Sequence, residues 1–491
     1  MAGKYSRDRN SDTPRSSADY IRAGKTPPRR RPRYQKKRRL NLKLILLGAL
    51  SLTLVILLFS CVFHQDKEDD KPADVEDNRS GVSSWFGPKE TEAPTDPPTE
   101  PKMEITHTAT ISATGDVLMH MPVINSCKTS DGSYDFTGIF RYLDDYAAEA
   151  DYAVANLETT LAGTGNGYNY SGYPCFNCPD EIADALKAAG FDMLLTSNNH
   201  CYDTRTVGLT RTLEVANELG LDTLGTQPDA EAADYTIETV GGIKIGMMCY
   251  SYATSDSYPD RPSMNGILTG TEAEGMINYF DYDQLDKFYT GVADAIADME
   301  AAGAEATVLY IHWGEEYQLS PNSNQTAIAQ KLCDLGIDVI VGGHPHVVQP
   351  VELLTSSVDE THRTVCLYSM GNAISNQQRQ NMNLTTGHTE DGVLFSFTFA
   401  RYSDGEVLLD SVEILPTWVH MDTTGSSRTY QILPLDADVA DWAAAFEISE
   451  SVVTSAKASY DRTMTLVGDG IAASQDYLTA QREAKLAEPA A

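Results

Sequence analysis

Short apolar runs alternate with amphipathic segments through the middle of this 491-residue chain. Residues 105–117 (ITHTATISATGDV) and 150–158 (ADYAVANLE) are typical of β-strands, and residues 179–190 (PDEIADALKAAG) have the spacing of an amphipathic helix. Consecutive parallel strands need a crossover connection, which is usually a helix. The alternation therefore predicts an α/β domain with a largely parallel sheet over residues 104–434.

Two stretches of the same domain predict antiparallel pairing instead. Residues 235–252 (YTIETVGGIKIGMMCYSY) are typical of a hairpin that turns at Gly241 and Gly242, and residues 391–419 have the pattern of two antiparallel strands. After this domain, amphipathic spacing without a cluster of chemically active side chains predicts a C-terminal helical extension over residues 435–491.

The chain before this domain divides into three segments of contrasting composition. Residues 1–43 hold 15 Lys and Arg against three Asp, residues 44–63 are twenty uncharged residues, and residues 64–103 are rich in charge, Pro, Ser and Thr. Twenty mostly apolar residues match the roughly 30 Å core of a bilayer, and the basic flank favours the cytoplasmic side. We expect a basic cytoplasmic tail, a single transmembrane helix and a disordered extracytoplasmic linker. The protein would then be a single-pass protein of the cell membrane with its main domain extracellular.

Other interpretations of the N-terminal segments stay open. The apolar run could belong to a cleaved signal peptide, or Cys61 could be lipidated, and both would still put the domain outside the membrane. The basic tail directly precedes the apolar run, which favours attraction to anionic lipid over binding of nucleic acid. The whole chain carries a net charge of −33, so its acidic remainder should repel polyanions at long range.

Polar residues directly follow five of the apolar runs. They are Asp116, Glu158, the triplet Asn198, Asn199 and His200, then His312, and the pair His344 and His346. Ligands of α/β sheets bind beyond the carboxyl ends of the strands, so we expect these side chains to converge in one crevice. Carboxylate, amide and imidazole groups together suit metals such as Zn, Mn and Fe. Two such ions bridged by a carboxylate would favour hydrolysis, typically at phosphorus.

The ordered motifs GDV, NLE, NNH, HWGEE, GGHPHVVQ and YSMGN extend from Gly115 to Asn372. This series resembles that of the poly-gamma-glutamate capsule biosynthesis protein CapA family, which is related to the calcineurin-like metallophosphoesterases. The resemblance implies a metallophosphoesterase-like αββα sandwich. It also implies divalent metal ions as cofactors, two ions of Mn, Zn, Fe or a similar metal.

The resemblance implies a role for individual residues as well. Those that correspond to metal ligands are Asp116, Glu158, Asn199, His312, His344 and His346, with Glu158 in the bridging position. His200 corresponds to a general acid or transition-state stabiliser, and we expect it to act in catalysis together with Asp116. Five more residues are candidates for metal binding or for support of the ligands: His120, Asn156, Asn198, Glu316 and Asn372.

The chain departs from the phosphoesterase pattern at two positions. The phosphoesterases have Asp-x-His in the first motif, whereas His120 lies four residues after Asp116, so His120 is either a ligand or a loop residue that faces solvent. Glu158 replaces an aspartate, and its extra methylene can change the choice or the spacing of metals. Pro345 is expected to hold His344 in extended geometry, so that the imidazoles of His344 and His346 diverge toward separate ions.

Three functions are compatible with these residues. The first, which we favour narrowly, is a metal-dependent hydrolase at the cell surface that acts on a phosphoester or on a cell-envelope polymer. The second is a non-catalytic subunit of a polyglutamate synthesis or export complex, whose site binds metal or polymer. The third is an envelope scaffold without a metal site. The expected partners are the membrane, polyglutamate synthase or export subunits and an envelope polymer, and nucleic acid is not expected.

The eight cysteines give a weaker signal than the histidines. Cys61 lies in the apolar run, which leaves seven in the rest of the chain. Cys175 and Cys178 form a C-x-x-C without a second such pair, which argues against a zinc ribbon. A loop disulfide or buried free thiols are expected at these positions.

Overall fold

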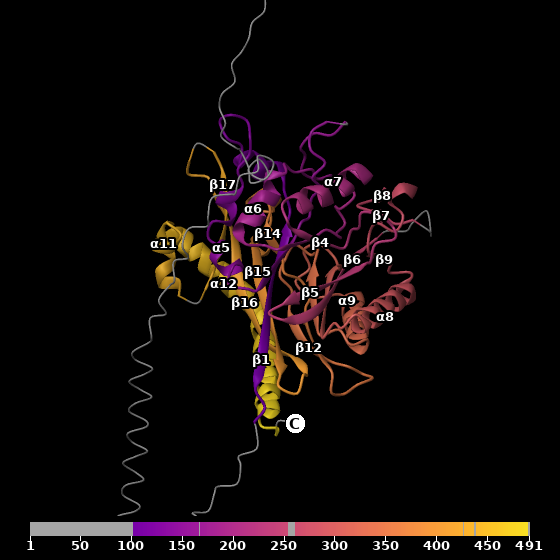
Figure 1. Ribbon diagram of the computed structural model, residues 1–491. Coiled ribbons are helices and arrows are strands. Elements are labelled where there is room, and N and C mark those ends of the chain that lie inside the picture. Colours follow the sequence, from indigo (N-terminus) through magenta and orange to yellow (C-terminus); the bar gives the residue numbers. More distant parts are fainter. Residues whose placement is uncertain (1–101, 166, 254–260, 426, 437, 490–491) are drawn as a thin grey trace, which may run out of the picture. The chain divides into compact units, whose positions relative to one another are not determined.

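The computed structural model describes residues 102–489 apart from residues 166, 254–260, 426 and 437 (Figure 1). The predicted tail, the predicted transmembrane helix and nearly all of the predicted linker lie outside these residues. Within the described part of the chain, no helix combines the length and the apolar character needed to cross a membrane.

The first sheet is mixed, with the strand order β17-β16-β15-β1-β2-β3-β4 and β14 placed beside β1. Its parallel strands are β1 (Ile105–Val117), β2 (Tyr152–Asn156), β3 (Met193–Leu195), β4 (Asp222–Leu224) and β14 (Asn372–Ile374). The antiparallel strands are β15 (Asp391–Tyr402), β16 (Val407–Asp422) and β17 (Thr429–Pro434). The antiparallel pairing predicted for residues 391–419 is therefore confirmed as β15 and β16, on a sheet that is parallel only in part.

The second sheet has the strand order β12-β13-β11-β10-β6-β5, with β9 beside β6. Its strands are β5 (Tyr235–Val240), β6 (Ile243–Tyr252), β9 (Tyr279–Phe280), β10 (Ala306–His312), β11 (Val339–Gly343), β12 (Val351–Thr355) and β13 (Arg363–Leu367). The predicted hairpin is confirmed, because β5 and β6 pair antiparallel and Gly241 and Gly242 have φ of 56° and 87°. A separate small hairpin consists of β7 (Ser263–Met264) and β8 (Ile267–Leu268).

The two sheets share one apolar core, and helices cover their outer faces (Figure 1). Ala109, Ile111 and Ala113 of β1 belong to the same buried cluster as Met247 of β6 and Val308 of β10. The first sheet is covered by α3 (Met121–Ser126), α4 (Thr137–Phe140), α5 (Asp144–Ala147) and α6 (Glu181–Ala189). The second sheet is covered by α8 (Leu285–Ala301) and α9 (Ser323–Asp334). The chain is thus a mixed α/β domain in which both sheets lie between layers of helices.

The C-terminal residues form α11 (Trp442–Ala445) and the long helix α12 (Glu450–Leu486). Helix α12 contacts β16 of the first sheet and β12 of the second. Its side chains Val467 and Leu478 are buried in the core that the two sheets share. The helical extension is therefore part of the packing between the sheets rather than an addition to the surface.

Candidate metal centre

The residues that follow the apolar runs lie at the carboxyl ends of parallel strands from both sheets. In the first sheet, Asp116 is near the end of β1, and Glu158 lies two residues beyond the last residue of β2. In the second sheet, His312 is the last residue of β10, and His344 directly follows β11. Strand β10 pairs in parallel with β11, with His312 opposite Gly343, which brings His344 and His346 to the same edge.

A local irregularity in β1 sets the position of Asp116. The register of β1 with β2 shifts between Thr114 and Asp116, and the register with β14 shifts directly after Asp116. Gly115 permits this bend, because a Cβ at this position would lie only 1.9 Å from the carbonyl oxygen of Gly371. The bend re-aims the Asp116 carboxylate at the strand end.

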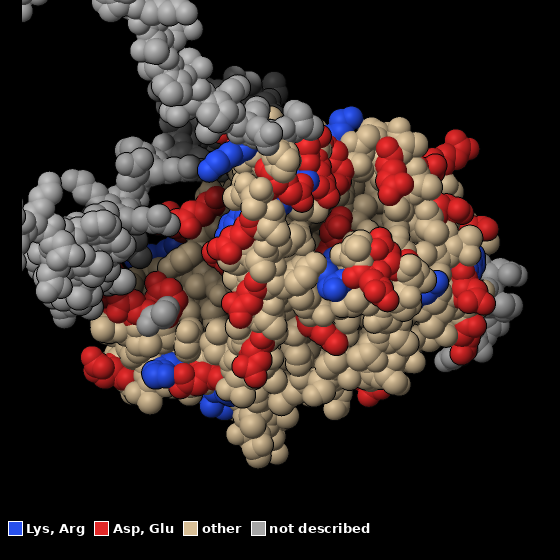
Figure 2. Space-filling view, turned by 90° about the horizontal axis from the view of Figure 1, so that it is seen from below, with Lys and Arg blue, Asp and Glu red and all other residues tan. Residues whose placement is uncertain are grey.

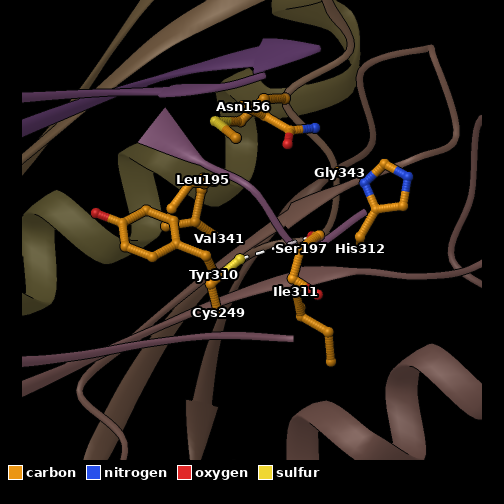
Figure 3. Close-up of a pocket in the computed structure, with 10 residues that line it drawn as sticks. Asn156, Leu195, Ser197, Cys249, Tyr310, Ile311, His312, Val341 and Gly343 are labelled. Atoms are coloured by element: carbon orange, nitrogen blue, oxygen red, sulfur yellow. Dashed lines mark hydrogen bonds between the residues drawn. The ribbon is translucent and has the colours of Figure 1, made fainter. Parts of the chain in front are cut away.

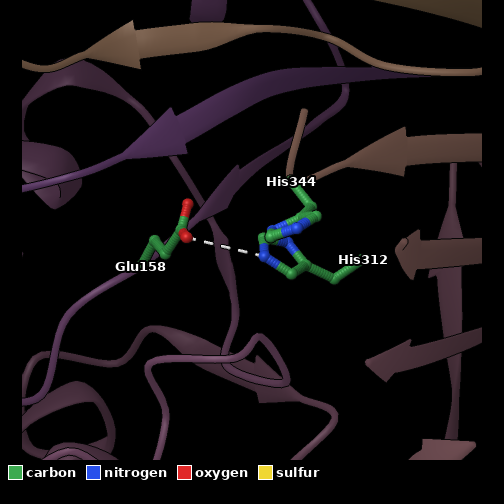
Figure 4. Close-up of side chains that lie close together, drawn as sticks. All are labelled: Glu158, His312 and His344. Atoms are coloured by element: carbon green, nitrogen blue, oxygen red, sulfur yellow. Dashed lines mark ion pairs between the residues drawn. The ribbon is translucent and has the colours of Figure 1, made fainter. Parts of the chain in front are cut away.

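One group of potential ligand atoms comes from Glu158, His312 and His344, whose atoms all lie within 4.8 Å of one another (Figure 4). The Nε2 atom of His312 lies 3.5 Å from Oε1 of Glu158. The same nitrogen lies 2.9 Å from Oδ1 of Asn199, which adds an amide oxygen to this group. All four side chains are buried.

A second group consists of Asp116, Glu158 and His346, also with ligand atoms within 4.8 Å of one another. The Nδ1 atom of His346 lies 2.9 Å from Oδ2 of Asp116, and its Nε2 atom lies 3.9 Å from Oε1 of Glu158. Asn156 donates a hydrogen bond of 2.7 Å to the other carboxylate oxygen of Asp116. Glu158 is therefore common to both groups, in the position of a bridge.

The donor atoms of the two groups fit divalent metal ions. Both carboxylate oxygens of Glu158 and Nδ1 of His344 are buried and have no hydrogen-bond partner within the described part of the chain. A buried carboxylate without a hydrogen bond is costly, and a bound cation would remove that cost. The mixture of carboxylate, amide and imidazole ligands suits Zn, Mn, Fe and related metals.

Charge and burial act on the ionisable groups of the site in different directions. Burial alone would lower the pKa of His346, but the charges of Glu158 and Asp116 and the hydrogen bond to Asp116 raise it to about 9. Burial alone would raise the pKa of Asp116, yet His346 brings it below its usual value. Burial, with the neighbouring histidines, puts the pKa of His344 well below its usual value, so this imidazole is neutral and able to bind a metal.

The backbone of the HPH segment differs from the expected extended form. His344 and His346 have φ of 94° and 54°, so the expectation that Pro345 would keep His344 extended is wrong. Two hydrogen bonds hold this conformation: Tyr317 N donates to Pro345 O at 2.8 Å, and Asn372 Nδ2, at the start of β14, donates to His346 O at 3.2 Å. Positive φ at a residue other than glycine is unfavourable, and such strained residues cluster at functional sites, where the surrounding structure enforces them. The imidazoles still diverge, one to each group of ligand atoms.

His200 lies next to the ligand groups and is paired with a residue that the strand-end pattern misses. Its Nδ1 atom lies 2.7 Å from Oδ2 of Asp203, and both side chains are buried. The ring of Phe176 packs edge-on against the imidazole, with 4.6 Å between the ring centroids. Asp203 follows His200 by three residues in a turn, and this spacing is the sequence signal that could have revealed it.

Asn156 and Asn198 support the site rather than extend it. Asn198 Nδ2 donates to the carbonyl oxygen of Leu157 at 2.9 Å and to Asn156 Oδ1 at 3.2 Å. The Oδ1 atom of Asn198 accepts the backbone N–H of His200 at 3.1 Å. These bonds connect the loop after β2 to the loop after β3 and fix the backbone on either side of Asn199.

The other three candidates lie around the two ligand groups. His120 belongs to neither group: its ring packs edge-on against Phe176, and its buried setting lowers its pKa to about 4. Glu316 is exposed, and its charge acts on His346. Asn372 is buried, and its Nδ2 binds the backbone of the HPH segment. The structure therefore places His120 in the loop directly before α3, partly buried and packed against Phe176.

Tyr252 is a further residue of the site that sequence reasoning missed. It ends β6, and its neighbour Ser251 is opposite His312 in the sheet. Its ring lies parallel to that of His312 and has its centroid 4.8 Å from that of His344. A tyrosine that ends an apolar run is common in any strand, so the sequence alone gives no reason to select it.

The two sheets close tightly beneath the ligand groups. A cavity of only about 10 Å³ remains there, lined by residues that include Asn156, Ser197, Cys249, Tyr310 and His312 (Figure 3). The Cys249 thiol donates to the carbonyl oxygen of Ser197 at 3.7 Å across it. This volume holds about one water molecule, so the space between the sheets at this point has no room for a larger ligand. All seven cysteines of the described part are free thiols, and a disulfide between Cys175 and Cys178 is not formed.

Known proteins are similar in sequence to the part of the chain that contains this site. Residues 110–377, more than half of the chain, match the family described as bacterial capsule synthesis protein PGA_cap. The capsule biosynthesis protein CapA of Bacillus anthracis is 27% identical over 271 residues, which are 55% of this chain and 60% of that protein. The PGA biosynthesis protein CapA of Bacillus subtilis is 24% identical over 365 residues, 72% of this chain and 84% of that protein. A probable polyglutamine synthesis accessory protein of Mycobacterium tuberculosis is 25% identical over 204 residues, 41% of this chain and 52% of that protein.

The similarity is to part of the relatives, since the chain spans less than two thirds of the B. anthracis protein and 84% of the B. subtilis protein. The residues that match the family include every member of both ligand groups. They also include His200 and Asp203. The resemblance seen in the ordered motifs is confirmed, and the chain belongs to the bacterial capsule synthesis protein family PGA_cap.

Proposed function

We propose that the protein is a metal-dependent hydrolase of phosphoesterase type that takes part in the metabolism of polyglutamate capsule or of another cell-envelope polymer. The observation that carries this proposal is Glu158, a buried carboxylate common to both ligand groups whose oxygens have no hydrogen-bond partner in the described part of the chain. The layering of helices and sheets supports a metallophosphoesterase-like αββα sandwich. The names of the relatives support the link to capsule and polyglutamate.

The residues of the site have separable roles in this proposal. Asp116, Glu158 and His346 would hold one divalent ion, and Glu158, Asn199, His312 and His344 would hold a second. Such ions, when bound, activate water and neutralise charge on a phosphoryl group. Asp203 accepts the Nδ1 proton of His200. When His200 is protonated at both nitrogens, Nε2 can give its proton to the leaving group, and the neutral Nδ1–H tautomer remains.

The acidic surface bears on the class of substrate. The chain has a net charge of −33, and Figure 2 shows acidic side chains spread over the visible face with few basic ones among them. Such a surface repels polyanions at long range. A polyglutamate chain would therefore depend on the metal ions for its local attraction to the site.

The location of the protein is part of the same proposal. Residues 44–63 would anchor it in the cell membrane, with residues 1–43 in the cytoplasm and the domain outside. An extracytoplasmic domain would meet capsule or envelope polymer directly. Partners of polyglutamate synthesis or export would meet it at the same surface of the membrane.

A second candidate function is a non-catalytic subunit that binds metal or polymer in a polyglutamate synthesis complex. The names of the relatives favour it, because they describe biosynthesis proteins and, in M. tuberculosis, a probable synthesis accessory protein. Glu158 in the bridging position favours it as well, since a longer carboxylate alters the spacing of metals.

Metal analysis and turnover assays on the purified full chain separate these functions. We expect divalent metal after reconstitution with Mn²⁺ or Zn²⁺, and turnover of bis-nitrophenyl phosphate or nitrophenyl phosphate that His200→Ala and His344→Ala abolish. His107→Ala is the matched control, because His107 is exposed at the far end of β1. Bound metal without turnover of the esters or of polyglutamate would favour the binding subunit. No bound metal after reconstitution would contradict the hydrolase and a metal-binding subunit, and would leave only a subunit that binds polymer.

A further inference from the structure

The small β7–β8 hairpin contributes one side chain, Asn265, to the paired His200 and Asp203. We propose that Asn265 is a positioning residue that fixes the Asp203 carboxylate and, through it, the orientation and tautomer of the His200 imidazole. The catalytic consequence of this inference rests on the proposed hydrolase function. The positioning itself rests only on the contacts of the hairpin.

The side-chain amide of Asn265 uses both of its N–H groups at this point. Its Nδ2 atom donates to Oδ1 of Asp203 at 2.9 Å and to the carbonyl oxygen of Pro174 at 2.8 Å. The distance of 3.3 Å from Nδ2 to Nδ1 of His200 is then a packing contact, since the Nδ1 proton goes to Asp203. The reversed amide would put its oxygen against a carboxylate and a carbonyl, so this orientation is the favourable one.

Asp203 is held at three points as a result. Its Oδ2 atom accepts from Nδ1 of His200 at 2.7 Å and from the backbone N–H of Phe176 at 2.6 Å. Asn265 supplies the hydrogen bond to Oδ1. Hydrogen bonds at both oxygens keep the Asp203 carboxylate from rotating about its side-chain bond. The Oδ2 atom that accepts from His200 therefore has a fixed position.

The backbone conformation of the hairpin turn allows the Asn265 side chain to reach Asp203. Asn265 and Gly266 have φ of 50° and 69°, the left-handed values required by the two-residue turns that favour Asn-Gly. Met264, the residue before the turn, is buried in a cluster with Cys201 and Tyr202, which lie between His200 and Asp203 in the chain. The packing of Met264 thus attaches the hairpin to the His200–Asp203 turn.

A hydrogen bond from the backbone just after the hairpin also connects it to the His200–Asp203 turn. The backbone N–H of Gly270 donates to the hydroxyl of Tyr202 at 3.0 Å. The hairpin therefore contacts the His200–Asp203 turn through an apolar side chain before the turn, a backbone bond after it, and the Asn265 amide at its tip. Removal of the amide alone should leave the other two attachments in place.

The effect on the proposed reaction should be confined to proton transfer. Asn265 belongs to neither ligand group, so its loss should leave metal content unchanged. A misplaced general acid affects substrates in proportion to their need for protonation of the leaving group. Phenyl phosphate should therefore lose more rate than 4-nitrophenyl phosphate, whose leaving group departs without help.

Two substitutions test the inference while keeping the turn. Asn265→Gly removes the amide, and Asn265→Asp puts a carboxylate against Oδ1 of Asp203; Gly-Gly and Asp-Gly both suit this turn. We expect kcat for phenyl phosphate to fall about 10- to 100-fold in both variants, and kcat for 4-nitrophenyl phosphate to fall less than about 3-fold, with KM and metal content unchanged.

Asn383→Gly is the matched control, an exposed asparagine with φ of 54° in another loop. Equal losses on the two esters, or none, would overturn the inference.

A second readout does not depend on turnover. In the full chain labelled with ¹⁵N-histidine and compared with His200→Gln for assignment, the neutral imidazole of wild-type His200 should carry its proton on Nδ1, the form that remains after Nε2 has given up a proton. Both Asn265 variants should show a mixture of tautomers or an exchange-broadened signal. An unchanged His200 signal in both would contradict the positioning role. Absence of wild-type turnover with altered signals would count against the hydrolase function and leave the positioning role supported.

Discussion

The Nδ1 atom of His346 lies 2.9 Å from Oδ2 of Asp116, and the two side chains are 2% and 0% exposed. They are 230 residues apart in the sequence: Asp116 lies near the end of β1 in the first sheet, and His346 follows β11 of the second. Their contact therefore joins the two sheets at the edge where the ligand atoms gather. Because the pair is buried, its protonation state is coupled to the stability of the fold.

The metal-free protein should lose stability in alkaline solution through His346. Its pKa in the folded state is about 9, above the ordinary value of 6.5 for an unfolded chain. Its contribution is therefore complete below pH 6.5 and disappears as the pH rises through about 9. The shift corresponds to a contribution on the order of 3 kcal/mol to the free energy of unfolding.

Urea denaturation in the presence of a chelator, from pH 6 to pH 10, measures this contribution. The wild type should lose stability over that range relative to His346→Gln, whose curve lacks this component. His107→Gln, at an exposed position, should follow the wild type. Parallel curves for wild type and His346→Gln would contradict the assignment.

Substitution of Glu158 should weaken binding of metal at both ligand groups at once. Glu158→Gln keeps the size of the side chain and removes the charge that both groups share. We expect the affinity for Mn²⁺ and Zn²⁺, measured by calorimetry, to fall by more than about 100-fold, since loss of mere supporting residues costs 10- to 100-fold. Glu413→Gln, an exposed position on β16, is the control. Retention of two ions at wild-type affinity in Glu158→Gln would rule out the bridging role.

Gly342 should tolerate no side chain. It lies in β11 two residues before His344, and a Cβ there would come within 2.0 Å of the carbonyl oxygen of Tyr368 and 2.6 Å of the indole nitrogen of Trp313. Gly342→Ala should lower the free energy of unfolding by about 3 kcal/mol, because backbone atoms would have to move. Gly291→Ala is the contrasting control: nothing lies within 4 Å of its Cβ in helix α8, so it should stabilise by about 0.5–1 kcal/mol. Equal effects in thermal unfolding would contradict the predicted clash.

The sequence was sufficient to select the strand ends but not to arrange them. Asp116, Glu158, His312 and His344 each follow an apolar run, and parallel pairing puts such positions at one edge. Which sheet each strand belongs to depends on contacts between distant segments, as for the pair Asp116 and His346. A periodic pattern carries no information of that kind.

Short or exposed elements were beyond the reach of sequence patterns for a different reason. Strands β7, β8 and β14 have only two or three residues, too few to show a period. Asn265 lies in the turn of such a hairpin and Asp203 lies in a turn after β3, so neither directly follows an apolar run. Helix α12 was expected from its spacing, but its place between the sheets follows from the shape of the core.

The ion pair between Arg462 of α12 and Asp391 of β15 should be among the stronger single contributions of the C-terminal helix. Arg462 donates to both carboxylate oxygens of Asp391, at 2.8 Å from Nε and 2.7 Å from Nη2, and Ser459 donates to one of them at 2.5 Å. Burial raises the pKa of Asp391 to about 6 even with the arginine in place. Arg462→Met should cost about 3–5 kcal/mol at pH 8, since it leaves a buried carboxylate without its charged partner.

The pH dependence of that loss gives the sharper test. A folded-state pKa above the ordinary value of 3.8 means that protonation of Asp391 favours the folded state, so stability from this group falls as the pH rises through about 6. Removal of the arginine strengthens the preference of the folded state for protonated Asp391. The loss of stability in Arg462→Met should therefore be smaller at pH 5 than at pH 8. Asp391→Asn combined with Arg462→Met should recover most of the loss. Lys457→Met breaks an exposed pair of the same helix and should change stability by less than about 1 kcal/mol at either pH. Denaturant unfolding of the four proteins at pH 5 and pH 8 measures these changes. Equal changes in the free energy of unfolding for Arg462→Met and Lys457→Met would contradict a stabilising role of the buried ion pair.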